Sequence, residues 1–258
     1  MKRHKICKII FAILAVFLCV AFYELIGICV TYKKQPAVSD ATIKETQNIM
    51  SVAGRENTER AVIIEKNSQA LLERVRLIQN AKDEIILSTF AFKSDESGKL
   101  ILGALHDAAD RGVHVRILVD GMESWIDMEG NPYFYGLSSH ENVEIKLYNK
   151  ANPLKPWKTM GRMHDKYLIA DGKIYILGGR NTYNYFLGDF PGHKNFDRDV
   201  LVVCDEPQKD NSVNQLWNYF ETIWEQEDCR YFHNSKKLAD RQLSLIHISE
   251  PTRLDVIS

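Results

Sequence analysis

The chain opens with a basic cluster and a long apolar run. Four lysine or arginine residues lie within the first eight positions, and the stretch from Ile9 to Tyr32 then carries a single charge, Glu24. At about 1.5 Å per residue this run can cross the roughly 30 Å hydrocarbon core of a bilayer. No small-x-small cleavage site follows it, so we predict an uncleaved single-pass anchor within residues 1–34 rather than a secretory signal. The basic cluster outweighs Lys33 and Lys34, which slightly favours an extracytoplasmic body.

Residues 35–60 are polar and lack a sustained apolar stripe, which is typical of a linker. From residue 61 onward, apolar positions recur with two periods. A helical period marks three segments: Ser68–Ala81, Gly98–Gly112 and Asn211–Gln226. Short β-rich runs mark six others: Glu84–Phe92, Val113–Asp120, Asn142–Asn149, His164–Asp171, Lys173–Gly179 and Arg198–Asp205. Because strands and helices alternate, we predict an α/β sheet with parallel members over residues 61–242. The Asp171–Gly172 pair predicts a tight turn between two antiparallel strands.

Composition narrows the function only slightly. The 258 residues carry a net charge of −1, which argues weakly against a nucleic-acid partner because no whole-molecule positive field is present. Five cysteines are scattered without the C-x-x-C spacing of zinc or redox sites. The sequence also has no carboxylate cluster that suggests a metal, so we expect neither a metal nor another cofactor.

The stretch "MHDKYLIADGKIYILGGRN" carries the candidate chemistry. In a strand, alternate side chains share a face, so His164 and Lys166 should point the same way, about 6 to 7 Å apart. A neutral imidazole can attack phosphorus, while a lysine supplies charge to the non-bridging oxygens. Paired glycines, Gly178 and Gly179, would let backbone approach a ligand closely, and Asn181 could donate a hydrogen bond to it.

Each of these residues alone has an ordinary structural explanation, since single histidines in strands are usually packed and lysines are usually solvated. Together they are specific. The pattern H-x-K-x4-D-x6-G-G-x-N should arise by chance in such a chain on the order of once in a hundred thousand cases. Asp171 closes the first strand, where a structural hydrogen bond at the turn suits it better than direct chemistry.

The pattern resembles the HKD motif of the phospholipase D superfamily and matches it at His164, Lys166, Asp171, Gly178, Gly179 and Asn181. The segments "AKDEIILSTFAF", "ALHDAADRGVHVRILVD" and "FDRDVLV" are similar to the same family, with most likeness to its cardiolipin synthase branch. The resemblance implies a phospholipase D-like α/β/α sandwich, one half of a two-domain protein. It also implies metal-free phosphatidyl transfer, with His164, Lys166 and Asp171 as catalytic residues and the glycines and asparagine as support.

The sequence departs from the family in one respect. The resemblance implies two HKD motifs that share one site, yet this chain holds a single H-x-K. Residues 243–258 begin with "LSLIHISEPTR", which looks like a translated sequencing adapter, so we exclude them from the fold and expect the natural protein to continue beyond Gln242. The missing partner would be a second HKD half or a second copy of the chain.

Two further residues are candidates for supporting the site. A catalytic imidazole needs an acceptor on its second nitrogen, and the resemblance points to Asp199, with Asp197 as second choice. A solvated carboxylate paired with Arg198 is an equal alternative. Arg162 lies two residues before His164 and could contact phosphate from the same face, although a surface arginine is as good an explanation.

We therefore interpret the chain as part of a membrane-anchored phosphatidyltransferase or phospholipase with a phospholipid substrate, acting through a phosphohistidine. The main alternative is a single-motif phosphodiesterase or nuclease that builds its site from two identical chains. A non-enzymatic lipid-binding or scaffolding fragment is the third. Head-group preference, transfer versus hydrolysis and the identity of the nucleophilic histidine stay open at this point.

Overall fold

The computed structural model describes residues 2–33, 39–41, 43–44, 59–206 and 211–233. Contacts divide the chain into two units, one that includes the N-terminal helix with Ala151–Met160 and one that includes the rest of the body. Most of the predicted linker and all of the presumed adapter sequence, residues 243–258, lie outside the described residues. The N-terminal helix α1, Lys2–Tyr32, is long and apolar enough to cross a membrane by length and composition.

The body is built on a mixed eight-stranded sheet in the part of the chain that the structure describes, with the strand order β1-β7-β6-β5-β2-β3-β4-β8. The strands are β1 (Glu59–Ile64), β2 (Glu84–Thr89), β3 (His114–Asp120), β4 (Val143–Tyr148), β5 (Lys166–Ala170), β6 (Ile174–Gly178), β7 (Asp199–Cys204) and β8 (Cys229–Tyr231). Among these strands only the neighbours β2, β3 and β4 run parallel, and every other neighbouring pair is antiparallel.

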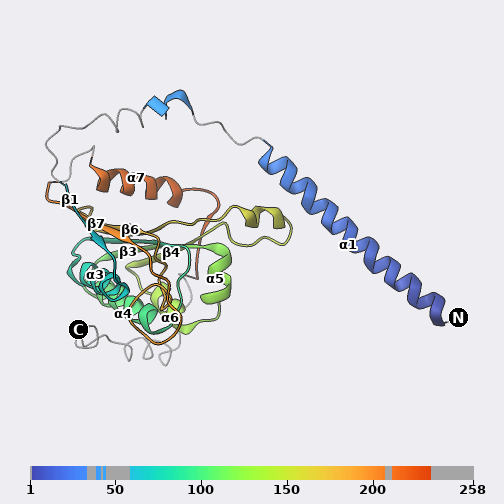
Figure 1. Cartoon of the computed structure of the whole chain (residues 1–258), viewed down its shortest axis with the longest axis horizontal. Coiled ribbons are helices and arrows are strands. Elements are labelled where there is room, and N and C mark those ends of the chain that lie inside the picture. The colour runs from blue at the N-terminus through green and yellow to red at the C-terminus, as the bar shows by residue number, and fades with distance from the viewer. Residues whose placement is uncertain (1, 34–38, 42, 45–58, 207–210, 234–258) are drawn as a thin grey trace. The chain divides into compact units, whose positions relative to one another are not determined.

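Helices cover both faces of this sheet. They are α3 (Asn67–Asn80), α4 (Glu96–Asp110), α5 (Gly121–Asp127), α6 (Pro132–Ser138) and α7 (Ser212–Trp224), and the 3-10 helix η1 spans Pro156–Met160. Figure 1 shows α7 on one face, with α3, α4 and α6 on the other. The strands supply both layers by alternation: Ile85 and Leu87 pack into the core under α3 and α4, whereas Ile86 packs toward α7. The predicted α/β/α sandwich is confirmed.

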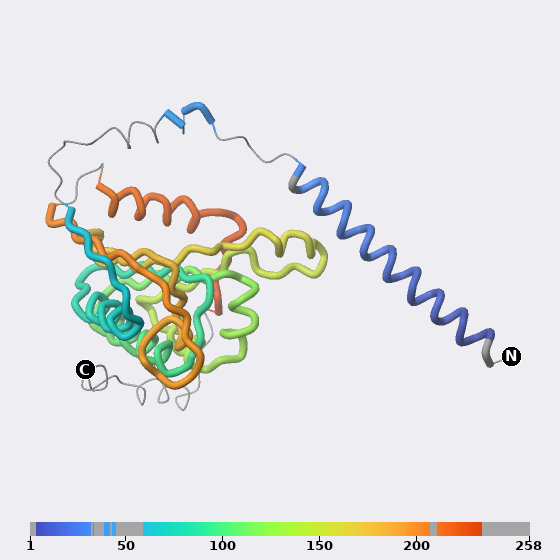
Figure 2. The backbone as a smooth tube through the Cα atoms, in the orientation of Figure 1, coloured from blue at the N-terminus to red at the C-terminus, as the bar shows by residue number. Residues whose placement is uncertain are grey.

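Most of the predicted elements are present. The strand pair around Asp171–Gly172 forms as β5 and β6, and both turn residues have positive φ, 53° and 59°, as a tight hairpin turn requires. Among the described residues five elements escaped prediction, and one of them is the 5-residue η1. The helices α5 and α6 have 7 residues each, too few for a helical period to show. Strand β1 follows a polar stretch and β8 has 3 residues. Figure 2 shows β1, in cyan, alongside the orange β7, far from it in sequence.

Candidate active site

The register of the sheet decides where the motif lies. Lys166 begins β5 and pairs with Thr89, the last residue of β2, so it lies at the carboxyl end of the parallel strands. Asp120, the last residue of β3, belongs to the same edge. His164 precedes β5 by two residues and is exposed. In open α/β sheets ligands bind beyond this edge, so the motif begins where a site is expected.

One aromatic ring, that of Phe90, gathers the groups of the site. Phe90 follows β2 directly, and its ring meets the His164 imidazole edge-on, with centroids 4.7 Å apart. The Lys166 Nζ lies 5.2 Å from the same ring centroid, and the Arg162 guanidinium carbon lies 4.9 Å from it. The structure therefore brings His164 and Lys166 to the same ring, although His164 is outside the strand, and their catalytic roles stay predictions. Phe90 was not predicted, because nothing in "STFAF" marks one aromatic residue as part of a site.

Lys166 is a buried lysine. It is 5% exposed, and its Nζ donates a hydrogen bond of 2.7 Å to the backbone oxygen of His164. Burial lowers the pKa of Lys166, while Asp165 and Asp197 oppose that shift. A charge with little competing water acts more strongly on a nearby anion than one in bulk solvent. The arrangement suits a lysine that meets a phosphate next to His164.

Arg162 is held by two carboxylates. Its Nε donates to Asp120 Oδ1 at 2.9 Å and its Nη2 donates to Glu123 Oε1 at 3.0 Å. The hydrogen bond to Asp120 is the first cause of the raised pKa of Arg162. Asp120 also accepts from the Met163 backbone nitrogen at 3.1 Å. Asp120 and Arg162 therefore fix the segment that leads into His164, and the role of Arg162 as a phosphate contact stays a prediction.

Asp199, predicted to hold the imidazole, is engaged elsewhere. Its Oδ2 lies 2.8 Å from Arg74 Nη1 and 3.2 Å from Arg180 Nη1, and its side chain is fully buried. Its Oδ1 has no hydrogen-bond partner among the described residues. No contact between Asp199 and His164 is found in the described structure. The carboxylate is instead the shared counter-ion of two buried guanidinium groups, which come from α3 and from the segment after β6.

The glycine pair allows two segments of the chain to approach each other closely. A Cβ on Gly178 would lie 2.0 Å from Asp199 Oδ1, and a Cβ on Gly179 would lie 2.0 Å from Asp197 Oδ2. Both glycines therefore allow the segment before β7 to approach β6. This is a packing requirement inside the chain, and the close approach of this backbone to a bound ligand stays a prediction.

Asn181 is 6% exposed and lies close to the site. Its Oδ1 accepts a hydrogen bond of 3.2 Å from the backbone nitrogen of Ala91, the neighbour of Phe90. This hydrogen bond joins the end of the motif to the residue after Phe90, whose ring contacts the His164 imidazole. Its role as a phosphate donor stays a prediction.

Asp171 lies at the opposite edge of the sheet. Its carboxylate accepts from the backbone nitrogens of Lys82, Asp83 and Glu84 at 3.0, 2.8 and 3.1 Å, and Glu84 is the first residue of β2. The whole of β5 separates it from His164. These contacts give Asp171 the structural hydrogen bonds that its turn position favoured, and they anchor the start of β2 to the β5–β6 turn; the catalytic role that the resemblance implies stays a prediction.

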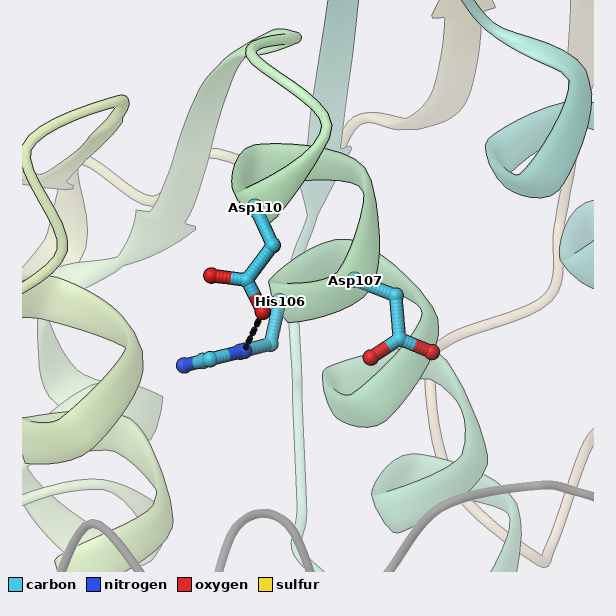
Figure 3. Close-up of side chains that lie close together, drawn as sticks. All are labelled: His106, Asp107 and Asp110. Carbon is cyan, nitrogen blue, oxygen red and sulfur yellow. Dashed lines mark ion pairs between the residues drawn. The ribbon is translucent and has the colours of Figure 1, made fainter.

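The described residues hold one group with metal-ligand potential, at that same far edge. Figure 3 shows His106, Asp107 and Asp110, whose ligand atoms lie within 4.8 Å of one another. Asp110 is paired at 3.1 Å with His106 and at 3.1 Å with His140. The Asn142 backbone nitrogen donates to His140 Nδ1 at 3.1 Å, so the Nε2 of that ring carries the proton that Asp110 accepts. These contacts make the group a polar clamp between α4 and the segment before β4.

The fold, with an exposed His164 beside a buried Lys166, is that of a phospholipase D-type domain. Over residues 75–224 the sequence matches the family described as "Cardiolipin synthase, PLD-like domain", and this match covers more than half of the chain. The protein belongs to this family. The predicted relationship to the cardiolipin synthase branch of the phospholipase D superfamily is confirmed.

Curated relatives of this chain share limited identity with it and are longer than it. The chain is 29% identical over 154 residues to cardiolipin synthase C of Escherichia coli, covering 54% of this chain and 31% of that protein. It spans about a third of the length of such curated relatives, between 31% and 35% of three of them.

Two solved structures share the fold at low identity. Phosphatidylserine synthase of Haemophilus influenzae superposes with a TM-score of 0.55 at 14% identity, over 73% of this chain and 42% of that one. NucT from Helicobacter pylori gives 0.50 at 17% identity, over 67% of this chain and 99% of that one. At these identities the likeness concerns the fold alone.

Proposed function

We propose that this chain carries half of a metal-independent phosphatidyltransferase or phospholipase that acts on membrane phospholipids through a phosphohistidine at His164. The observation that carries the proposal is the placement of His164 and Lys166 around Phe90, at the carboxyl edge of the parallel strands. The imidazole is exposed, where a phosphodiester can reach it, while the lysine is buried beside it. Membership in the cardiolipin synthase family supports a phospholipid as the substrate.

The reaction has two displacements. First, a ring nitrogen of His164 forms a bond to phosphorus while the bond to the departing alcohol oxygen breaks, and that oxygen takes up a proton. Second, an alcohol or water loses a proton, attacks phosphorus and releases His164. An acid-base group must therefore lie on the side opposite the nucleophile. One ring cannot occupy both sides, so the full reaction needs a second imidazole, from a further HKD half or from a second copy of the chain.

Membrane attachment is the second part of the proposal. The helix α1 has the length and composition of a membrane span, and a tethered site would stay beside a lipid substrate. We expect the protein to remain in membranes after high-salt and carbonate washes, with the body on the extracytoplasmic side. Release of a shortened soluble form would identify a cleaved signal instead.

The chemistry can be tested on this chain without its missing partner. A phospholipid with a p-nitrophenol leaving group needs no acid, because the nitrophenolate departs without a proton. The purified chain in detergent with EDTA should release about one equivalent of nitrophenolate, and peptide mass spectrometry should find the phosphatidyl group on His164. Natural phosphatidylglycerol should not be turned over by the chain alone.

The matched control is a second exposed histidine. His164→Ala should abolish this single-turnover burst of nitrophenolate. His114→Ala, at the opposite edge of the sheet, should leave the burst unchanged. Lys166→Ala removes a preorganised charged donor and should slow the burst by roughly 100- to 1,000-fold, as loss of one such donor does. A burst of normal size in His164→Ala, or a labelled residue other than His164, would overturn the assignment.

A second candidate is a phosphodiesterase assembled from two identical chains, each giving one His164. The length comparison favours it, because one body of this size accounts for 99% of the NucT chain. The same preparation separates the two proposals. A dimer by light scattering that cleaves unactivated phosphodiesters in EDTA, with loss of activity in His164→Ala, would support the homodimer and replace the leading proposal.

A further inference from the structure

The segment Ala151–Met160, which leaves the body after β4 and returns just before the catalytic histidine, has the composition of a membrane-interface element. Its charged residues are Lys155 and Lys158, and it contains no acidic residue. Its apolar residues include Trp157 and two that are largely exposed, Leu154 at 78% and Met160 at 68%. Tryptophan prefers the membrane–water boundary, and lysines next to apolar residues favour anionic headgroups.

A second observation sets the depth of this segment. It forms one compact unit with α1. The Trp157 ring meets the Tyr23 ring edge-on at 4.9 Å, and the Tyr23 hydroxyl donates to the Leu154 backbone oxygen at 2.9 Å. A Cβ on Gly27 would lie 2.3 Å from the Trp157 ring, so the glycine provides the contact surface for the indole.

The charge pattern of α1 places that contact at a membrane boundary. The helix carries no charge from Ile9 to Tyr23, about 22 Å at 1.5 Å per residue, and Glu24 is the next residue. Glu24 is the single charge between Ile9 and Tyr32, so we take it as the marker of one membrane boundary, and Trp157 lies at the same level. Two aromatic side chains at one end of a span are typical of the interfacial belt of membrane proteins.

We propose that Ala151–Met160 is a lipid-contacting loop that lies in the membrane interface, with Trp157 among the glycerol and upper acyl groups and Lys155 and Lys158 against anionic phospholipid headgroups. The inference rests on the proposed membrane span of α1. It deepens the proposed function, because the loop ends four residues before His164. Its base is fixed to the body by the Asn149 side chain, which donates to the Gly161 oxygen at 2.7 Å.

The test measures where Trp157 lies in a bilayer. The full chain is reconstituted in vesicles of phosphatidylcholine and phosphatidylglycerol whose acyl chains carry bromine near the headgroup, and tryptophan fluorescence is recorded. Wild type should be quenched, and Trp157→Phe, which retains a ring beside Tyr23, should lose most of that quenching. Trp125→Phe is the matched control: Trp125 is 60% exposed on α5 in the other unit, and its variant should keep the quenching.

The lysines are tested in the same vesicles. Wild-type quenching should increase with the phosphatidylglycerol fraction. The double variant Lys155→Gln with Lys158→Gln should lose that dependence, whereas Lys82→Gln with Lys173→Gln, at two exposed positions of the body, should retain it. Equal quenching of wild type at every phosphatidylglycerol fraction would overturn the assignment to anionic headgroups.

The outcomes separate this inference from the proposed function, because none of them depends on turnover. Undiminished quenching in Trp157→Phe, in protein that resists carbonate extraction, would overturn the loop and leave the anchor standing. Loss of quenching in Trp125→Phe alone would overturn it in favour of α5. Extraction of the full-length chain by carbonate would overturn the loop and the anchor together.

Discussion

Replacing Asp199 with asparagine should be among the most damaging single changes to the stability of the body. The variant keeps the shape of the side chain but removes the only carboxylate between Arg74 and Arg180 that the described structure shows in contact with both. These guanidinium groups lie 2.8 and 3.2 Å from Asp199 Oδ2, and their side chains are 5% and 0% exposed. Breaking a buried ion pair by removing one partner costs about 3 to 5 kcal/mol, because the remaining charge stays buried without compensation.

That loss is large enough to measure by thermal unfolding. For a domain of 150 to 250 residues, 1 kcal/mol shifts Tm by roughly 2 to 4 °C, so Asp199→Asn should lower Tm by roughly 6 to 20 °C. The assay is unfolding of the full chain in detergent, followed by near-ultraviolet circular dichroism. Asp205→Asn is the control: it breaks the ion pair with Arg60, whose side chain is 71% exposed, and should leave Tm almost unchanged.

A third variant examines the charge balance directly. Because the cluster has two cations and one anion, Arg74→Met leaves the Asp199–Arg180 pair balanced and should cost less than Asp199→Asn. Adding Arg74→Met to Asp199→Asn removes one of the two orphaned charges, so the double variant should be more stable than Asp199→Asn alone. The reasoning fails if Asp199→Asn lowers Tm no more than Asp205→Asn does. It also fails if adding Arg74→Met to Asp199→Asn lowers Tm further, by as much as Arg74→Met lowers the Tm of wild type.

Three shorter predictions concern the rest of the motif. Burial lowers the pKa of Lys166, so the charged form is disfavoured in the folded state, and this cost disappears as the pH rises through the folded-state pKa. Lys166→Met should therefore be at least as stable as wild type at neutral pH, with an advantage in urea unfolding that shrinks towards the unperturbed lysine pKa; a pH-independent difference would contradict this. Asp171→Asn should cost about 1 to 3 kcal/mol, since three backbone donors lose a charged acceptor, yet leave labelling of His164 per folded molecule intact. Gly178→Ala should cost about 1 to 3 kcal/mol, because its Cβ would meet Asp199 Oδ1 at 2.0 Å, and a normal Tm would contradict the packing role.

The layers of the fold could be predicted because each segment carries its own signal. Strands β2 to β7 show β-rich runs and α3, α4 and α7 show helical spacing, so alternation indicated an α/β sheet, and the family resemblance added the sandwich. Strand β1 could not be found this way. It pairs with β7, whose residues are more than 130 positions away, for example Ile64 with Asp199, and no local pattern encodes that partner.

Within the site, the sequence predicted the neighbouring positions of His164 and Lys166 better than it predicted the residues that contact them. His164 and Lys166 are two residues apart, so local geometry brings them together. The partners of Asp199 could not be read in the same way, because Arg74 is 125 residues distant and a buried arginine looks like a surface one until the fold is known. Phe90 was missed for a similar reason: an aromatic residue after a strand is ordinary until the register places Lys166 beside it.

The distance between the two ends of the motif has a consequence for how such sequences diverge. The histidine and the lysine of H-x-K-x4-D lie at the carboxyl edge of the parallel strands. The aspartate and the glycine pair instead hold neighbouring strands together. If His164 and Lys166 act as we propose, the motif combines two parts, one for reactivity and one for architecture. A descendant released from catalysis should drop the histidine and lysine freely while it retains the aspartate and glycines. Searches that demand the whole pattern would then overlook proteins with this body that have kept the scaffold and abandoned the reaction.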